Sequence, residues 1–375
     1  MSVADILEEI ERVEDDDAHH DFGGPQSNKG NDFAHFWLIV RMLDVEMAGP
    51  ADYMFVCEYV QDVAEFDSGS SPSTVTLYQL KKKEDGYWTP SDLTGQTKNS
   101  KTPKAGKPLT KLFKSVTAFK SLKARGTFIS NAKFDVSLGS AAKSTNDELI
   151  AISDWDQEHC DALRVGLGQL EGMLPADVDL SCLELRSVPL SVSDLEGHTT
   201  GVMFGFLQQK APGHANQASS LVDAIYVKLR SSARHTNKSK TWSELVERRG
   251  FGKLAFQQAV QSLASIPDKT AETDRLLDKL AKNWTTPHTI RVRMALSACL
   301  RDKVLVGDGN RWQIESTPIR ALCAHADATG QPEFECFESV AEALRVQLPE
   351  MPDIQITALA IHEMIESWTQ HPTLA

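Results

Sequence analysis

The pattern of apolar positions changes near the middle of the chain. Up to about residue 140 helical and strand periods alternate, and beyond about residue 200 the period is helical almost throughout. Residues 31–48 predict a strongly apolar helix that ends at the Gly49–Pro50 pair. Residues 53–66 and 74–82 predict two strands, which the turn-forming sequence DSGSSPS joins into a hairpin.

A second helix and a third strand follow the hairpin. The polar loop 84–108 leads into a predicted helix over residues 109–124. Its apolar residues follow the spacing of one buried face: Leu109, Leu112, Phe113, Val116, Phe119 and Leu122. Residues 125–138 predict another strand. The order helix, hairpin, helix, strand is typical of a compact α/β unit.

We therefore predict an α/β N-terminal region and a mostly α-helical C-terminal region. The predicted domains are 1–145, a connecting segment over 146–200 with a helix and one strand, and 201–375. Residues 242–263 could form a helix-turn-helix, but a plain helix pair is the preferred interpretation.

Composition narrows the class of protein. The chain has 375 residues and a net charge of −13, and no run of 18 apolar residues predicts a transmembrane span. The acidic N-terminus does not resemble a signal peptide. The six cysteines are widely spaced and form no CxxC pair, which favours reduced thiols in a cytoplasmic protein over a disulfide framework or a zinc site.

Charge is distributed unevenly along this acidic chain. Residues 81–125 contain 12 Lys or Arg and only 3 acids, so this window carries +9. A local basic tract is typical of a site for a polyanion such as nucleic acid. The alternative is a solvated lysine-rich loop, and the tract alone does not decide between the two.

The hairpin carries polar residues that could do chemistry. With a period of two, Glu58 and Asp62 share one face of the first predicted strand, and Gln79 and Lys81 share one face of the second. A carboxylate and an amide oxygen could hold Mg²⁺, while a neighbouring lysine offsets charge during phosphodiester hydrolysis. The alternative is an ordinary surface hairpin with one solvated face.

These residues carry a family resemblance. The order E-x-x-x-D-V (58–63) and Y-Q-L-K (78–81) resembles the PD-(D/E)xK nuclease pattern, in the variant of the CBASS-associated (CD-NTase-associated) double-stranded DNA endonucleases. In that family a Gln replaces the usual acid before the lysine. GNDFAHFW (30–37) and TFISNAKFD (127–135) resemble the family's first helix and following strand, so the resemblance covers roughly residues 20–140.

The resemblance implies a restriction-endonuclease-like core and a role for each motif residue. Asp62, Gln79 and Lys81 would be catalytic, and Asp62, Gln79 and Glu58 would bind Mg²⁺ or Mn²⁺. His35 or Asp32 would supply the contribution of the first helix. The lysines expected to contact the DNA backbone, without reading its sequence, are Lys82, Lys83, Lys98, Lys101, Lys104, Lys107, Lys111 and Lys114.

The resemblance also suggests partners. About 180 residues follow position 195 and predict helices, so we expect the long nucleotide-sensor domain of the CBASS nucleases to be absent. A nuclease of this type without its own sensor resembles the LmuA nuclease subunit of Lamassu anti-phage and anti-plasmid systems. That implies an SMC-like ATPase, a small accessory subunit and activation by assembly into a homo-oligomer, with no membrane. The competing hypothesis is a non-catalytic DNA-binding adaptor with a degenerate nuclease fold.

Overall fold

The chain forms two compact units. The computed structural model describes residues 2–16, 28–97, 102–140, 144–233, 238–264, 270–306, 314 and 316–370. The sheet unit comprises Met1–Thr199 and Tyr226–Phe256, and the helical unit comprises Thr200–Ile225 and Gln257–Ala375. All strands of the described residues lie in the sheet unit, which confirms the predicted α/β core with a mostly helical remainder.

The sheet unit is built on one mixed sheet of seven strands. The strands are β1 (Met54–Cys57), β2 (Val63–Phe66), β3 (Thr74–Leu80), β4 (Lys123–Ser130), β5 (Leu149–Ala151), β6 (Leu183–Ser187) and β7 (Gly250–Gly252). Their order across the sheet is β5-β6-β4-β3-β2-β1-β7. Strands β3, β4 and β6 are parallel, while β2, β1 and β7 continue the sheet in antiparallel pairs.

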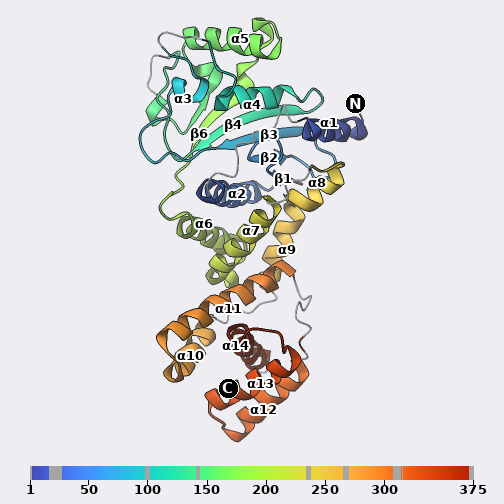
Figure 1. Ribbon diagram of the computed structural model, residues 1–375, viewed down its shortest axis with the longest axis vertical. Coiled ribbons are helices and arrows are strands. Elements are labelled where there is room, and N and C mark those ends of the chain that lie inside the picture. The colour runs from blue at the N-terminus through green and yellow to red at the C-terminus, as the bar shows by residue number, and fades with distance from the viewer. Residues whose placement is uncertain are drawn as a thin grey trace. The chain divides into compact units, whose positions relative to one another are not determined.

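Helices cover both faces of this sheet (Figure 1). They are α1 (Val3–Asp15), α2 (Asn28–Ala48), α3 (Pro90–Thr94), α4 (Pro108–Thr117), α5 (Gln157–Glu171) and α8 (Trp242–Arg249). Helix α4 is the crossover between the parallel strands β3 and β4, and Pro108 at its first position suits the fixed φ of proline. Its buried residues Leu112 and Phe113 pack in one core with Leu77 and Phe128 of the sheet.

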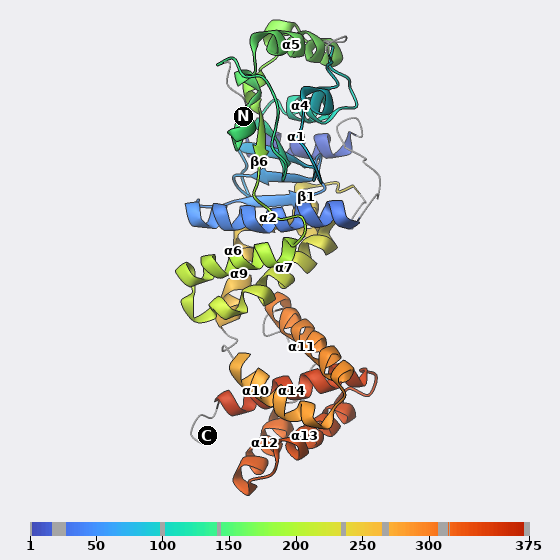
Figure 2. The same cartoon turned by 90° about the vertical axis from the view of Figure 1, so that its left-hand side faces the viewer.

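Helix α2 lies against the opposite face (Figure 2). Its Trp37 packs on Tyr78 of β3 with ring centroids 4.7 Å apart. Arg41 donates two hydrogen bonds of 2.9 Å to the Glu65 carboxylate on β2, and the Tyr78 hydroxyl donates a third of 2.7 Å. We call Arg41, Glu65 and Tyr78 the α2-side cluster.

The prediction of one strand over residues 53–66 is wrong. Strand β1 ends at Cys57, β2 begins at Val63, and residues 58–62 form the turn between these antiparallel strands. The Glu58 amide donates to the Asp62 carbonyl at 2.9 Å and closes the turn. Tyr59 and Val60 are buried although they lie in the turn, so the apolar pattern of the sequence continues from β1 through the turn and does not show where the strand ends. Glu58 and Asp62 therefore do not share one face of a strand.

The edge strands come from distant parts of the sequence. Strand β7 follows α8 and pairs with β1 in the register Phe55↔Phe251. The segment predicted as a possible helix-turn-helix is therefore a helix, a short edge strand and a helix. Strand β6 lies within the segment predicted to contain a strand, and β5 pairs with it at the other edge.

The helical unit has its own core. Its helices are α10 (Thr270–Leu280), α11 (Thr286–Val306), α12 (Ser316–Thr329), α13 (Glu333–Gln347) and α14 (Asp353–Gln370). Three further helices each belong partly to one unit and partly to the other: α6 (Leu195–Lys210), α7 (Ala218–Ala233) and α9 (Lys253–Ala264). Leu277, Val292, Phe337 and Ile361 are among the buried residues that join α10, α11, α13 and α14. In the part of the chain that the structure describes, every helix is too short or too polar to cross a membrane.

Candidate active site

The turn before β2 brings Asp62 beside the end of β3. Val63 pairs with Tyr78, so the next position outward sets Asp62 opposite Gln79. The backbone N–H of Leu80 donates to Asp62 Oδ2 at 2.6 Å. Gln79 has the same strand parity as Leu77, whose side chain lies in the core under α4. The structure therefore brings together the acid and the amide that the sequence pattern singled out.

Lys81 comes directly after β3 and extends its pairing. Its N–H donates to the Ile129 carbonyl at 3.0 Å, so the ladder between β3 and β4 continues one residue past the strand. Gln79 is buried with 1% of its surface exposed, whereas Asp62 and Lys81 are half-buried. We call Asp62, Gln79 and Lys81 the hairpin-end cluster. Its two charged groups lie at the boundary with solvent, where a substrate can reach them.

The turn that carries Asp62 is fastened on several sides. The Tyr59 hydroxyl donates to the Ile10 carbonyl of α1 at 2.7 Å, and Gln61 Nε2 donates to Ser115 Oγ of α4 at 2.8 Å. Burial raises the pKa of Tyr59 well above its ordinary value, so the hydroxyl keeps the proton that it donates. Glu58 is exposed at the outer end of the turn. The position of Asp62 is therefore set by two helices as well as by the sheet.

The chemistry of these side chains fits a hard divalent cation. Asp62 and Gln79 offer a carboxylate and an amide oxygen, and Glu58 adds a second carboxylate on the same turn. Within the described ranges no three His, Cys, Asp or Glu side chains gather as a metal-binding group, and the Gln79 amide would be a further oxygen ligand beside the carboxylates. Mg²⁺ keeps several waters and takes further oxygens from a substrate phosphate, so one or two carboxylates from the protein suffice.

The two residues considered on the first helix have other contacts. Tyr226 of α7 donates to Asp32 Oδ1 at 2.6 Å, and the ring of His35 meets the same tyrosine edge-on at 5.9 Å. Burial lowers the pKa of His35 to about 4, so this imidazole is neutral at physiological pH. Both contacts are packing interactions between α2 and α7, and a part for either residue in the site stays a prediction.

The lysines of the basic tract differ in the contacts that they make. Lys83 is engaged within its own loop: its ammonium donates to the Tyr87 carbonyl at 2.6 Å, lies 3.1 Å from Asp92 Oδ2 and sits over the Trp88 ring. Lys82 lies 3.9 Å from the exposed Glu84 carboxylate. Lys83 therefore has a structural role that the sequence did not predict.

The other lysines stand around the start of α4. Lys104 is exposed, and Lys107 is the N-cap residue, directly before the helix. Lys111 and Lys114 are half-buried on the helix itself. Lys98 and Lys101 lie outside the described residues. Helix α4 starts where β3 ends, because it runs back across the two parallel strands, so its first turn lies toward the end of the sheet that carries Lys81.

Side chains at the end of β4 fasten the loop that follows Lys81. Asn131 accepts from the Lys83 N–H and donates to the Lys83 carbonyl, both at 2.8 Å. Trp88 Nε1 donates to Ser130 Oγ at 2.8 Å. Ser130 and Asn131 lie within the segment 127–135 that resembles the family's following strand. The contacts of Ser130 and Asn131 hold the chain after Lys81 against β4.

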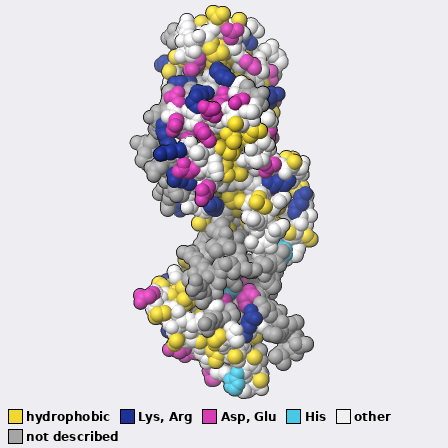
Figure 3. All heavy atoms as spheres, turned by 90° about the vertical axis from the view of Figure 1, so that its right-hand side faces the viewer, with side chains coloured by type: hydrophobic (Ala, Val, Ile, Leu, Met, Phe, Trp, Pro, Cys, Tyr) yellow, Lys and Arg dark blue, Asp and Glu magenta, His cyan; other side chains and the backbone are white. Residues whose placement is uncertain are grey.

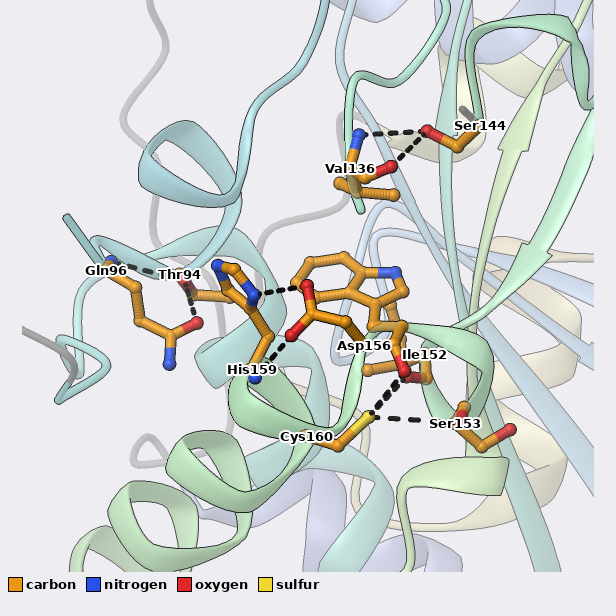
Figure 4. Close-up of polar contacts among 10 residues, drawn as sticks. Thr94, Gln96, Val136, Ser144, Ile152, Ser153, Asp156, His159 and Cys160 are labelled. Atoms are coloured by element: carbon orange, nitrogen blue, oxygen red, sulfur yellow. Dashed lines mark hydrogen bonds and ion pairs between the residues drawn. The ribbon is translucent and has the colours of Figure 1, made fainter. Parts of the chain in front are cut away.

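A second polar group, at the start of α5, has the form of a helix cap (Figure 4). Asp156 accepts from the His159 N–H at 3.0 Å and from His159 Nδ1 at 2.7 Å. The adjacent Cys160 is buried, and its Sγ points to the carbonyls of Ile152 and Trp155. Burial raises the pKa of the Cys160 thiol, which keeps it protonated. These contacts stabilise α5 and do not activate a nucleophile.

Charges of both signs are interspersed over the face of the sheet unit on the side of α1 and α8 (Figure 3). This view shows Lys and Arg side chains next to Asp and Glu, with apolar atoms between them.

Comparison with known proteins identifies the first part of the chain. Residues 22–233 match the family model described as "Cap4, dsDNA endonuclease domain". The match covers more than half of the chain and contains the hairpin-end cluster, α2 and α4. No curated protein and no solved structure matches the chain significantly.

Proposed function

The chain belongs to the Cap4 dsDNA endonuclease domain family, and from this premise we propose that it is a metal-dependent endonuclease that cuts double-stranded DNA. The observation that carries the proposal is the family match, within which Asp62 and Gln79 lie opposite each other at the end of the hairpin. We assign the chain to a bacterial anti-phage or anti-plasmid defence system, as its effector, in the cytoplasm.

In this proposal each residue of the hairpin-end cluster has a separate task. Asp62, Gln79 and Glu58 hold Mg²⁺ or Mn²⁺, which supplies Lewis-acid activation of the phosphodiester when bound. The Leu80 N–H orients the Asp62 carboxylate by its 2.6 Å hydrogen bond. The Lys81 ammonium offsets negative charge on the phosphate or orients the attacking water by donating a hydrogen bond to its oxygen. Lysines around α4 contact phosphates, so cleavage depends little on sequence.

A plasmid-cleavage assay tests the proposal. The full chain is incubated with supercoiled DNA and Mg²⁺ or Mn²⁺, beside Asp62→Ala and Lys81→Ala variants. Lys123→Ala is the matched control, because Lys123 is exposed and pairs with Thr74 at the opposite end of β3. We expect cutting by the wild type and the control and none by the other two variants.

The adaptor hypothesis is the second candidate. The observation that favours it is the absence of a three-acid group among the described residues, with Gln79 where such nucleases usually carry an acid. It prevails if the wild type binds duplex DNA but leaves it intact with every metal and in every assembly state.

Assembly is the proposed form of regulation. The family match ends at residue 233, and helices with a separate core follow it. We assign to them self-association and contacts with an SMC-like ATPase and a small accessory subunit. Size-exclusion chromatography with light scattering, run beside the cleavage assay, checks this. Efficient cutting by a purified monomer contradicts it.

A further inference from the structure

Two elements outside the matched segment meet at the turn that carries Asp62. Glu14 of α1 precedes residue 22, and Arg249 at the end of α8 follows residue 233. The Arg249 guanidinium forms an ion pair with the Glu14 carboxylate, and its other terminal nitrogen donates to the Glu58 carbonyl. Arg249 and Glu14 are 4% and 1% exposed. One buried arginine therefore joins both flanks of the nuclease segment to its turn.

The backbone of the turn explains why such a contact is needed. Glu58 has a φ of 49°, and it is the one non-glycine residue with positive φ in the described part of the chain. The left-handed conformation costs a residue with a side chain about 1–2 kcal/mol, so surrounding contacts must maintain it. A guanidinium can do so because its donors point in fixed directions from one plane.

The charges explain why both flanks take part. A buried cation without a partner is strongly unfavourable, and the Glu14 carboxylate removes that penalty for Arg249. Arg249 also lies in the last turn of α8, where a cation interacts favourably with the helix dipole. Strand β7 starts at the next residue and pairs with β1, which fixes where the arginine emerges. The pairing of β7 with β1 therefore places the Arg249–Glu14 ion pair beside the turn.

We propose that Arg249, held by Glu14, is a positioning residue of the nuclease site. It keeps Glu58 in the left-handed conformation, and the closed turn then sets Asp62 against the Leu80 N–H and beside Gln79. This inference rests on the proposed function for its catalytic meaning, but the positioning itself can be measured without cleavage. A purely stabilising role makes a different prediction, because it lowers the amount of folded protein and leaves each folded site unchanged.

The experiment compares three full-length variants with the wild type. Glu14→Gln/Arg249→Met removes both charges, so that no unpaired buried charge prevents folding. Arg249→Lys keeps the charge but cannot form both contacts with one planar group. Arg12→Met is the matched control, since Arg12 also lies on α1 and donates to a backbone carbonyl, that of Ala118 at 3.2 Å, and not to one within the turn.

Hydrogen exchange gives the readout that needs no activity. In the double variant the amides of Glu58 and Leu80, which donate to Asp62 in the wild type, should exchange at least about tenfold faster, while those of β4 stay protected. Arg249→Lys should fall between the double variant and the wild type, and Arg12→Met should match the wild type. Unchanged protection at both amides, or an equal loss across the whole sheet, overturns the proposal.

Cleavage kinetics give the second readout. We expect the Mg²⁺ concentration for half-maximal cleavage to rise in the double variant, and kcat to fall, by about 10–100-fold in combination, with KM for DNA unchanged. A lower kcat with unchanged Mg²⁺ dependence contradicts positioning, since it indicates only fewer folded molecules. If the wild type cuts no DNA, the proposed function fails, and the exchange result still decides whether Arg249 sets the turn.

Discussion

Two polar clusters occupy the same pair of strands and have opposite characters. Glu65 and Tyr78 belong to the α2-side cluster. Asp62 and Gln79 belong to the hairpin-end cluster; Asp62 lies three residues from Glu65, and Gln79 lies one residue from Tyr78. Glu65 receives two hydrogen bonds from Arg41 and one from Tyr78. Burial, and then the neighbouring Glu65, raise the pKa of Tyr78 above its ordinary value, so this hydroxyl stays protonated. The polar groups of these three side chains are therefore used in hydrogen bonds with one another.

The hairpin-end cluster differs in its place in the sheet. Asp62 lies in a turn and Lys81 lies just past a strand, and both are half-buried. Successive residues of a strand point to opposite faces, so two strands can carry both clusters without contact between them. Carboxylates three residues apart can therefore serve different ends: Glu65 holds α2 on the sheet, and Asp62 is placed where a ligand can reach it.

The largest expected effect is a loss of cleavage without a loss of stability, from Asp62→Asn. Asn retains an oxygen that can accept from the Leu80 N–H, so the turn should stay closed, but the charge that attracts a cation is gone. We expect cleavage to fall about 10²–10³-fold, with an unchanged urea midpoint. Asp85→Asn, at an exposed position, is the control. An active Asp62→Asn variant removes this residue from the site.

Glu65→Ala should give the opposite result, a loss of stability with little change in the activity of the folded protein. It leaves Arg41 and the Tyr78 hydroxyl without their acceptor between α2 and the sheet. We expect the free energy of unfolding to fall by about 3 kcal/mol, measured by urea denaturation. The double variant Arg41→Met/Glu65→Met should recover part of this loss, because no charge is then left unpaired. If Glu65→Ala instead abolishes cleavage at full stability, the two clusters are not functionally separate.

The free energy of unfolding should also depend on pH, through His35 of α2. Its folded-state pKa is about 4, below the ordinary 6.5, because burial disfavours the charged ring. The native state thus binds fewer protons than the unfolded state, so stability is full above pH 6.5 and falls as the pH drops toward 4. The expected loss at pH 5.5 is about 1.4 kcal/mol.

His35→Gln checks this assignment. In urea titrations between pH 7 and 5 the variant should lose this part of the pH dependence, whereas His325→Gln, at an exposed position of α12, should retain it. Identical pH profiles for wild type and His35→Gln rule out the buried imidazole as the source.

The sequence predicted the class of fold, because it depends on local periodicity, and it singled out Asp62 and Gln79, which the antiparallel hairpin sets opposite each other. It did not predict the turn at Glu58, since Tyr59 and Val60 are buried and keep the apolar pattern of a strand. It could not predict Arg249, whose partner Glu58 lies 191 positions away. Strand β7 was also missed, because Gly-Phe-Gly has no alternation to recognise. Contacts between distant segments leave no periodic signal in a single sequence.

The smallest expected effects concern lysines of the basic tract, and they extend the comparison from carboxylates to cations. Lys104 is exposed and Lys111 half-buried near the start of α4, whereas the Lys83 ammonium is engaged by Asp92 and the Tyr87 carbonyl. Removing a phosphate-contacting lysine should reduce the slope of log K against log salt by about 1. We expect this from Lys104→Ala and Lys111→Ala in duplex-binding titrations at several salt concentrations. Lys83→Ala should leave the slope unchanged and lower thermal stability slightly, and a reduced slope for that variant would instead mean that DNA displaces its internal contacts.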